Sequence, residues 1–361
     1  MRNLRQELLL CMAVCFGMNA GAVDYIVKGT AEGHDGTTVY LRDYNDRCMI
    51  DSALIVNGQF EIKGKYGRDA YVRVEFGREY ANIVLSDGIT EIDFASHGPK
   101  NGSTANQALK DYTEYETSFF KAYSDSVEAM KLRYPDKNDF LREVKACGDR
   151  NRLLYRAKID SIFNNNLDNG VCEVLLMEYN DLLTPDEWEK LYATFPDRIR
   201  NLKGTEEYNR KFMSMKRTAV GQPFIDIKGK DMQGNPASLS DYIGHGKYVL
   251  VDFWASWCGP CIQEATETIM PLYEKYKNDD RLIILSVATW DKFENSTKAI
   301  AKHGYQWSQL LDTGMKPMEE YGFDGIPQIM LFGPDGTILQ RDLRGVSITN
   351  SVEEALKPEN R

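Results

Sequence analysis

The chain has 361 residues, of which 42% are hydrophobic and 27% are charged, and its formal net charge is −10. This balance is typical of soluble globular proteins and excludes collagen-like, low-complexity and polytopic membrane classes, while the length indicates two or three domains. The negative charge argues against binding to a nucleic-acid backbone, and seven cysteines are too few for a disulfide scaffold.

The first 22 residues have the pattern of a secretory signal peptide. Arg2 and Arg5 precede an apolar stretch over residues 8–18, which is followed by Ala20-Gly21-Ala22. A basic start, an apolar region of this length and a small-residue cleavage site are typical of such signals. We therefore expect cleavage after Ala22 and export to the periplasm or cell envelope, where disulfides persist. No later segment has the roughly 20 apolar residues of an integral membrane span.

Residues 23–98 have the pattern of a β-rich domain. Short apolar runs at residues 25–27, 38–41 and 71–74 are separated by Gly and Asp turn signals. Between two further apolar stretches, Asn57-Gly58 is typical of a two-residue hairpin turn. Strands at this spacing predict a small antiparallel sandwich or barrel, and we find no catalytic pattern in it.

Residues 99–217 have helical periodicity and are predicted to form a helical connector. Apolar and aromatic residues recur at three- and four-residue spacings, as at Tyr112, Tyr115 and Phe119. Thr184 before Pro185 is typical of a helix start. We interpret the aromatic stripe as core, because such periodicity more often marks a buried face than a binding face.

Residues 218–361 alternate between strand and helix patterns, which predicts an α/β domain with a mostly parallel sheet. Residues 248–254 (YVLVDFW) are a nearly continuous apolar run, as expected for a strand buried on both faces. Further strands are expected at residues 283–287 and 328–332, with residues 337–340 as a hairpin partner of the last.

The chemistry is concentrated in the sequence Trp257-Cys258-Gly259-Pro260-Cys261, between a buried strand and a helix. Two cysteines at this spacing lie on one helical face and can form a short disulfide. The unpaired N–H groups of the helix start favour the anionic form of Cys258, so we expect it to be the attacking thiolate. Cys261, one turn deeper, would resolve the mixed disulfide. The alternative of half a zinc site lacks a second ligand pair.

Two acidic residues are candidates for proton transfer to and from Cys261. Asp252 lies within an apolar run, where a carboxylate is costly unless it has a partner or a function; its alternative is a strand end that faces water. Glu264 follows Cys261 by three residues and shares its helical face. Its alternative is a first-turn acid that is stabilised by the helix dipole.

These residues carry a family resemblance. The segment VDFWASWCGPC, together with Gly325-Ile326-Pro327 ahead of a strand, resembles thioredoxin. The stretch between residues 288 and 325, with Cys-x-x-Glu at Cys261, is more similar to the exported TlpA/ResA-like thiol-disulfide oxidoreductases. The resemblance covers residues 219–345 and implies a thioredoxin fold. The β-rich region resembles an uncharacterised domain that recurs ahead of such modules.

The resemblance also implies site residues and partners. It implies that Pro327 is cis and lies against the cysteine pair, where it helps to bind the partner chain. Ile326 and Trp257 are further candidates for substrate binding, and the alternative for Trp257 is packing around the disulfide. The Gly-Pro dipeptide and Ile326 are more similar to reductants than to oxidants, so we expect a disulfide reductase that acts on disulfide-bearing envelope proteins. Such an enzyme needs no cofactor, but it needs a membrane-bound electron donor.

Two other functions compete with the reductase. A thiol peroxidase of the same fold needs Thr three residues before its cysteine, where this chain has Ala255. A non-catalytic envelope protein could use its front domains to bind a partner, since fold alone does not guarantee activity. Cys147 and Cys172 could form a structural disulfide or remain buried thiols, because the geometry that pairing needs cannot be deduced from sequence.

Overall fold

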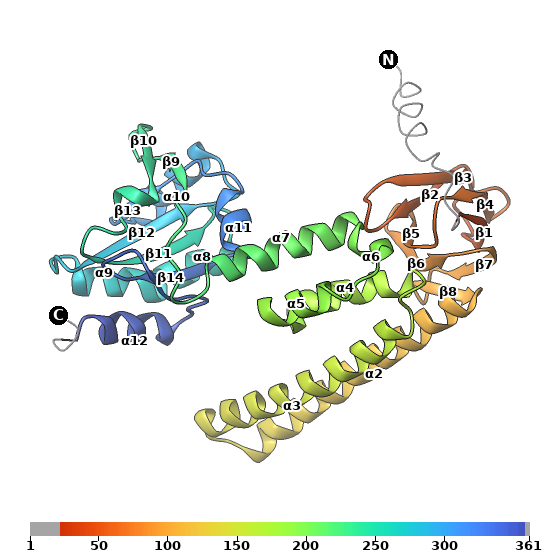
Figure 1. Ribbon diagram of the computed structural model, residues 1–361, viewed down its shortest axis with the longest axis horizontal. Helices are drawn as coiled ribbons and strands as arrows, with labels where there is room; N and C mark the ends of the chain where they lie inside the picture. The colour runs from red at the N-terminus through yellow and green to blue at the C-terminus, as the bar shows by residue number, and fades with distance from the viewer. Residues whose placement is uncertain (1–21, 358–361) are drawn as a thin grey trace. The chain divides into compact units, whose positions relative to one another are not determined.

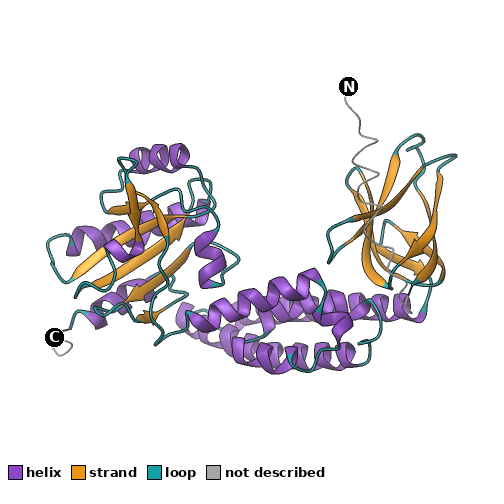
Figure 2. Cartoon of the chain, turned by 45° about the horizontal axis from the view of Figure 1, so that its top comes forward, coloured by secondary structure: helices purple, strands orange, loops and turns teal. Residues whose placement is uncertain are grey.

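A computed structural model describes residues 22–357 (Figure 1), so the predicted signal peptide lies outside the described residues except for Ala22. The chain forms two units, one of residues 22–183 and 191–206 and the other of residues 184–190 and 207–357. Within the described range, no helix is both long and apolar enough to cross a membrane. The predicted order of a β-rich region, a helical region and a C-terminal α/β domain is confirmed (Figure 2).

The first unit begins with a sandwich of two four-stranded sheets, in the orders β4-β1-β7-β8 and β3-β2-β5-β6. Alternate residues face inward on several strands, as Phe60 and Ile62 do on β4, and the inward-facing residues form one apolar core. The strands are β1 (Val23–Thr30), β2 (Thr38–Asp43), β3 (Met49–Leu54), β4 (Gln59–Tyr66), β5 (Ala70–Phe76), β6 (Glu79–Leu85), β7 (Gly88–Asp93) and β8 (Gly98–Asn101).

Two details of the predicted strand pairing are wrong. Asn57 and Gly58 do form the expected two-residue turn, with φ of 53° and 68°. The strands beside that turn, however, belong to different sheets, since β3 pairs with β2 and β4 pairs with β1. In addition, β1 pairs with β7 in parallel, so the sandwich is not wholly antiparallel. A tight turn determines only that the chain reverses direction at that point. Strands that are connected through longer segments can pair either parallel or antiparallel.

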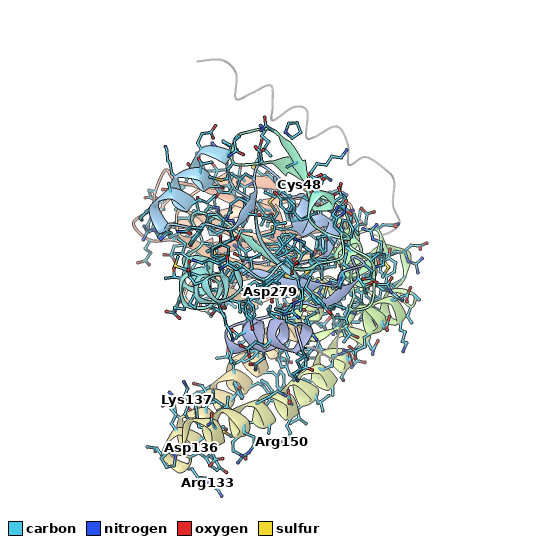
Figure 3. All side chains as sticks on the ribbon, turned by 90° about the vertical axis from the view of Figure 1, so that its left-hand side faces the viewer. Cys48, Arg133, Asp136, Lys137, Arg150 and Asp279 are labelled. Atoms are coloured by element: carbon cyan, nitrogen blue, oxygen red, sulfur yellow. A yellow bond between two sulfur atoms is a disulfide. The ribbon has the colours of Figure 1, made fainter. Side chains whose placement is uncertain are left out.

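The helical region follows the sandwich. Its two long helices, α2 and α3, start at the side-chain caps Ser103 and Asp136, whose oxygens accept N–H groups of the first turn. Figure 3 shows Arg133, Asp136 and Lys137 together at the turn between them. The helices are α2 (Thr104–Arg133), α3 (Lys137–Asn164), α4 (Val171–Leu182), α5 (Pro185–Tyr192), α6 (Asp197–Arg200) and α7 (Lys203–Arg217).

A buried carboxylate joins α4 to the sandwich. Glu173 is fully buried, and it accepts hydrogen bonds from Arg68 Nη1, from Asn45 Nδ2 at 2.9 Å and from the backbone N–H of Tyr71 at 3.1 Å. A buried charge is tolerated only when it is paired and hydrogen-bonded. These contacts therefore fix the position of α4 against β5.

The second unit contains a five-stranded sheet in the order β13-β12-β11-β14-β15. β11 is buried on both faces, as predicted from its apolar run: Leu250 and Trp254 join one core, and Val249, Val251 and Phe253 join the other. The strands are β11 (Tyr248–Trp254), β12 (Leu282–Ala288), β13 (Ser308–Leu310), β14 (Gln328–Phe332) and β15 (Ile338–Gln340), with a separate small ribbon of β9 (Lys228–Lys230) and β10 (Pro236–Ser238).

This sheet is mixed rather than mostly parallel. β11, β12 and β13 run parallel to one another. β14 runs antiparallel to β11, and a short turn then joins it to β15, which pairs antiparallel with it. The helical elements are η1 (Leu239–Asp241), α8 (Gly259–Glu264), the π-helical segment η2 (Ala265–Ile269), α9 (Met270–Tyr276), α10 (Phe293–His303), α11 (Lys316–Tyr321) and α12 (Val346–Ala355).

Candidate dithiol active site

Cys258 and Cys261 form a disulfide between the end of β11 and the first turn of α8. Cys258 is the N-cap of α8, and its sulfur accepts the backbone N–H of Cys261 at 3.2 Å. This N–H group would also stabilise a thiolate at Cys258 when the disulfide is reduced. Both cysteines are buried in the disulfide form, but Cys258 is at the N-cap of α8, whereas Cys261 is within its first turn. The geometry thus makes Cys258 the better placed of the two sulfurs for attack on another molecule.

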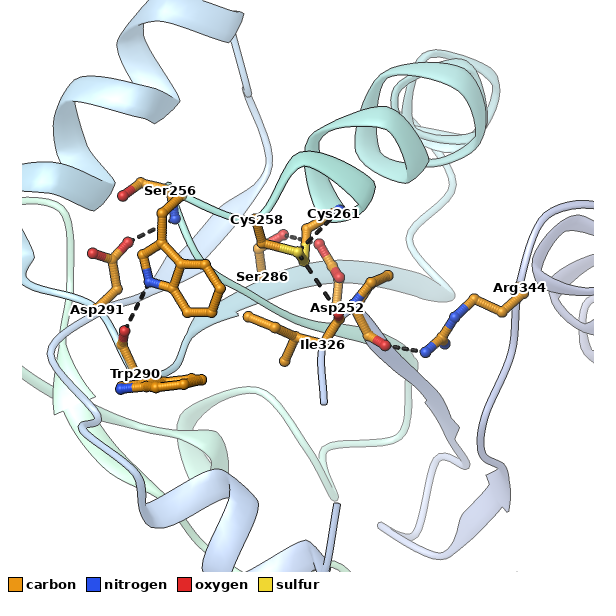
Figure 4. The surroundings of a disulfide bond; sticks show 11 residues. Asp252, Ser256, Cys258, Cys261, Ser286, Trp290, Asp291, Ile326 and Arg344 are labelled. Carbon is orange, nitrogen blue, oxygen red and sulfur yellow. Dashed lines mark hydrogen bonds between the residues drawn. A yellow bond between two sulfur atoms is a disulfide. The ribbon is translucent and has the colours of Figure 1, made fainter. Parts of the chain in front are cut away.

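The segment before β14 lies against the disulfide. The peptide bond between Ile326 and Pro327 is cis. The carbonyl oxygen of Ile326 is 3.7 Å from Cys258 Sγ, and Arg344 donates a hydrogen bond to the carbonyl oxygen of Pro327 (Figure 4). Because β14 pairs with β11, the sheet itself brings this distant segment to the cysteine pair.

Asp252 is buried on β11 with 2% exposure, so the alternative of a water-facing strand end is excluded. Its Oδ2 accepts a hydrogen bond from Ser286 Oγ at 3.1 Å, and Ser286 Oγ accepts one from Trp307 Nε1 at 2.8 Å. Its Oδ1 is also buried, without a hydrogen-bond partner among the described residues. Burial raises the pKa of Asp252 to about 7. A carboxyl with this pKa can both accept and release a proton near neutral pH.

Glu264 is half-buried on α8 and is held by a backbone group. Both of its carboxylate oxygens accept the N–H of Gly345, at 3.2 and 3.1 Å, just before α12 begins. Its negative charge contributes to the raised pKa of Asp252, which burial dominates. The structure therefore gives Glu264 a second effect, on Asp252, besides its predicted role at Cys261.

Several residues at the site were missed by sequence reasoning. The segment after β12 is bonded to the cysteine loop twice: Asp291 Oδ2 accepts the N–H of Ser256 at 2.7 Å, and the carbonyl oxygen of Trp290 accepts Trp257 Nε1 at 3.0 Å. Arg344, which binds the Pro327 carbonyl, comes from the far end of the domain. Only Ser286 had a signal, since it is the one polar residue in the apolar strand LIILSVA.

The two cysteines of the helical region do not pair. Cys147 and Cys172 are separate, buried thiols on α3 and α4. Burial raises the pKa of Cys172 to about 12, so this thiol is protonated and unreactive at neutral pH. The redox-competent pair of the described residues is Cys258 and Cys261.

Two segments of the chain match known protein families, and one of them holds this disulfide. Residues 220–341 match the AhpC/TSA family, and residues 25–109 match DUF4369, a domain of unknown function. We call the matched residues 220–341 the AhpC/TSA domain. Cys258, Cys261 and Pro327 all lie within the matched part of the AhpC/TSA domain.

Two relatives of the AhpC/TSA domain are named for thiol-disulfide chemistry. It is 33% identical over 122 residues to the thiol:disulfide interchange protein CycY of Rhizobium leguminosarum, a match that covers 34% of this chain and 62% of CycY, less than two thirds of its length. It is 28% identical over 151 residues to the thiol-disulfide oxidoreductase ResA of Bacillus thuringiensis, covering 42% of this chain and 84% of ResA.

Among solved structures, the thioredoxin domain of a thiol-disulfide oxidoreductase from Bacteroides vulgatus is 36% identical, with a TM-score of 0.35; the match covers 38% of this chain and 99% of that domain. The part of this chain that holds Cys258 and Cys261 is thus similar to two proteins named for thiol-disulfide chemistry.

Proposed function

We propose that this chain is an exported protein disulfide reductase in which Cys258 attacks and Cys261 resolves. The observation that carries the proposal is the position of the disulfide: Cys258 caps the start of α8, Cys261 lies in the first turn of that helix, and the carbonyl of Ile326 lies 3.7 Å from the attacking sulfur. An extended segment of another protein could place its own backbone beside that carbonyl while its disulfide reaches Cys258.

The reaction begins with the reduced protein. The Cys258 thiolate attacks one sulfur of the substrate disulfide and forms a mixed disulfide, and the other substrate sulfur leaves as a thiolate that takes a proton from solvent. Cys261 then loses its proton to the Asp252 carboxylate and attacks Cys258 Sγ. The second substrate sulfur leaves as a thiolate that takes a proton from solvent, Asp252 releases the proton of Cys261, and the protein holds the Cys258–Cys261 disulfide. Two electrons pass from the protein dithiol to the substrate.

The direction of electron flow is proposed from the residues between and beside the cysteines. Gly259-Pro260 and Ile326 are similar to the residues at these positions in reducing members of the family. A reductant of this kind must receive two electrons after every turnover. We assign that supply to a membrane-bound dithiol donor and the substrates to disulfide-bearing envelope proteins. In an assay, dithiothreitol replaces the donor.

A single-turnover assay tests the reductase. The chain from residue 23 onward is reduced, freed of dithiothreitol and mixed with insulin, whose disulfides are exposed. We expect one insulin disulfide to be lost for each Cys258–Cys261 disulfide formed, as measured by thiol alkylation and mass spectrometry. Insulin that stays oxidised would contradict the function. Rapid thiol-dependent consumption of hydrogen peroxide in a parallel assay would instead indicate a peroxidase, although Ala255 occupies the position of its threonine.

Export is proposed from the first 22 residues, whose basic start, apolar stretch and Ala20-Gly21-Ala22 carry the signal-peptide pattern. Expression of the full chain in a Gram-negative host should yield a periplasmic protein that starts at Val23, as shown by fractionation and intact mass. An unprocessed chain in the cytoplasmic fraction would be inconsistent with export.

A further inference from the structure

Trp290 is a large apolar side chain that the structure leaves exposed beside the cysteine loop. It lies between β12 and α10 and is 55% exposed, and its neighbour Trp257 is 54% exposed. The two rings meet edge to face, with centroids 5.0 Å apart. Figure 4 shows Trp290 and Ile326 on the same side of Cys258. Because more than half of each indole stays in contact with solvent, the pair does not serve mainly to bury itself.

The position of Trp290 is fixed on both sides by hydrogen bonds. The backbone N–H of Trp290 donates to the carbonyl oxygen of Gly314 at 2.7 Å, and the backbone carbonyl oxygen of Trp290 accepts a hydrogen bond from Trp257 Nε1 at 3.0 Å. The next residue, Asp291, accepts the N–H of Ser256 at 2.7 Å and Ser296 Oγ at 2.9 Å. The backbone of Trp290 is therefore held beside the loop that carries Cys258, while its indole stays exposed.

The backbone of Trp290 is in the left-handed region, with φ of 54°. Glycine and asparagine adopt this conformation readily, whereas a bulky side chain is strained there. Strained residues of this kind occur mainly at ligand-binding and active sites, where the surrounding structure holds them. Local folding alone would favour a smaller residue at this turn, so the tryptophan needs another explanation.

We propose that Trp290 is a substrate-binding residue of the reductase, which contacts a bulky apolar side chain next to the cysteine of the substrate disulfide. The inference rests on the proposed function, since the occupant is the segment of the substrate that must lie beside Cys258 in the mixed disulfide. Trp290 and Trp257 form one exposed aromatic pair, and Trp257 directly precedes the attacking Cys258 in the chain. Rigid, amphipathic rings give contact area at a low cost in conformational entropy, and they make the enzyme selective for substrates with an apolar neighbour.

Two peptides and three variants test this inference. Each peptide has one internal disulfide; phenylalanine follows both cysteines in one, and serine follows both in the other. Trp290→Gly fits the left-handed backbone and removes the indole, whereas Trp290→Phe keeps an aromatic ring. Met232→Ala is the matched control, because Met232 is also an exposed apolar residue (38%) of this unit but lies in the turn between β9 and β10. Values of kcat/KM are measured with dithiothreitol as reductant.

We expect the unsubstituted protein and Met232→Ala to prefer the phenylalanine peptide about tenfold. In Trp290→Gly this preference should fall to about twofold or less, while Trp290→Phe should keep most of it. Equal rates for the two peptides in the unsubstituted protein, or an unchanged preference in Trp290→Gly, would overturn the inference and leave the reductase intact. Failure to reduce either peptide would overturn the reductase itself, together with this inference.

Discussion

Replacement of Cys258 by serine is expected to lower the rate of insulin reduction at least about 10³-fold, because a hydroxyl is a far weaker nucleophile toward sulfur than a thiolate.

Replacement of Cys261 by serine should have a different result. Cys258 can still attack, but no second thiol releases the substrate, so a covalent adduct of the protein with the substrate should accumulate. The adduct is detected by non-reducing electrophoresis and by intact mass, and it disappears when dithiothreitol is added.

Cys147→Ser is the matched control for both variants. Cys147 is a buried thiol on α3, whose sulfur accepts a hydrogen bond from Asn151 Nδ2 at 3.3 Å, and it has no part in the proposed reaction. It should reduce insulin at the rate of the unsubstituted protein and form no adduct. A Cys258→Ser protein with the unsubstituted rate would contradict the assignment of the nucleophile. Absence of the adduct in Cys261→Ser would contradict the order of attack.

Asp252→Asn should make the protein more stable at pH 8 and at the same time less active. The pKa of Asp252 is about 7 in the folded protein, above its ordinary value of 3.8. The folded state therefore binds this proton more tightly than the unfolded chain does. The contribution of the protonated carboxyl to the free energy of unfolding is fully present below about pH 4 and is lost as the pH rises through about 7. A difference of about three pKa units corresponds to roughly 4 kcal/mol. Asparagine stays neutral, so it avoids this loss.

The expected gain from Asp252→Asn is on the order of 2–4 kcal/mol in the free energy of unfolding at pH 8, shrinking toward zero near pH 4. Urea unfolding across this pH range measures it. Asparagine cannot accept the proton of Cys261, so the rate of the resolving step should fall about 10²-fold or more. In the unsubstituted protein this rate should rise with pH and level off above about 7, and the variant should lack that inflection.

Glu264→Gln provides the comparison for Asp252. The amide can still accept the N–H of Gly345, but it removes a negative charge that raises the pKa of Asp252. The inflection in the resolving step should therefore remain and move to lower pH. If Asp252→Asn were less stable than the unsubstituted protein at pH 8, or if it kept an inflection near pH 7, Asp252 would not be the buried proton acceptor.

Most parts of the site that could be predicted from sequence are encoded within one local segment; the cis Pro327 was predicted from the family resemblance instead. Cys258 and Cys261 share a helix turn, and Asp252 stands out because it is charged within an apolar strand. Ser286, Trp290 and Arg344 come from segments that are distant in the chain. They reach the site because β12 pairs with β11 and because β14 carries the Pro327 segment alongside.

The fold shows the same limit. Asn57-Gly58 encodes a turn, because both residues tolerate a positive φ, and the turn forms where it was predicted. Which strands pair on either side depends on the whole sandwich, and the prediction failed there. The tryptophan at position 290 gives no signal in sequence, because its meaning lies in its φ and in its exposure next to Trp257.

The reduction potential of the Cys258–Cys261 pair is the most direct test of the reductase. It can be measured in the chain from residue 23 onward by equilibration with a dithiothreitol or glutathione series and detection of the free thiols. We predict a value near or below that of thioredoxin, about −270 mV, at which the protein donates electrons to substrate disulfides. A value near that of DsbA, about −120 mV, would contradict the proposal, because a pair at that potential would oxidise envelope thiols instead.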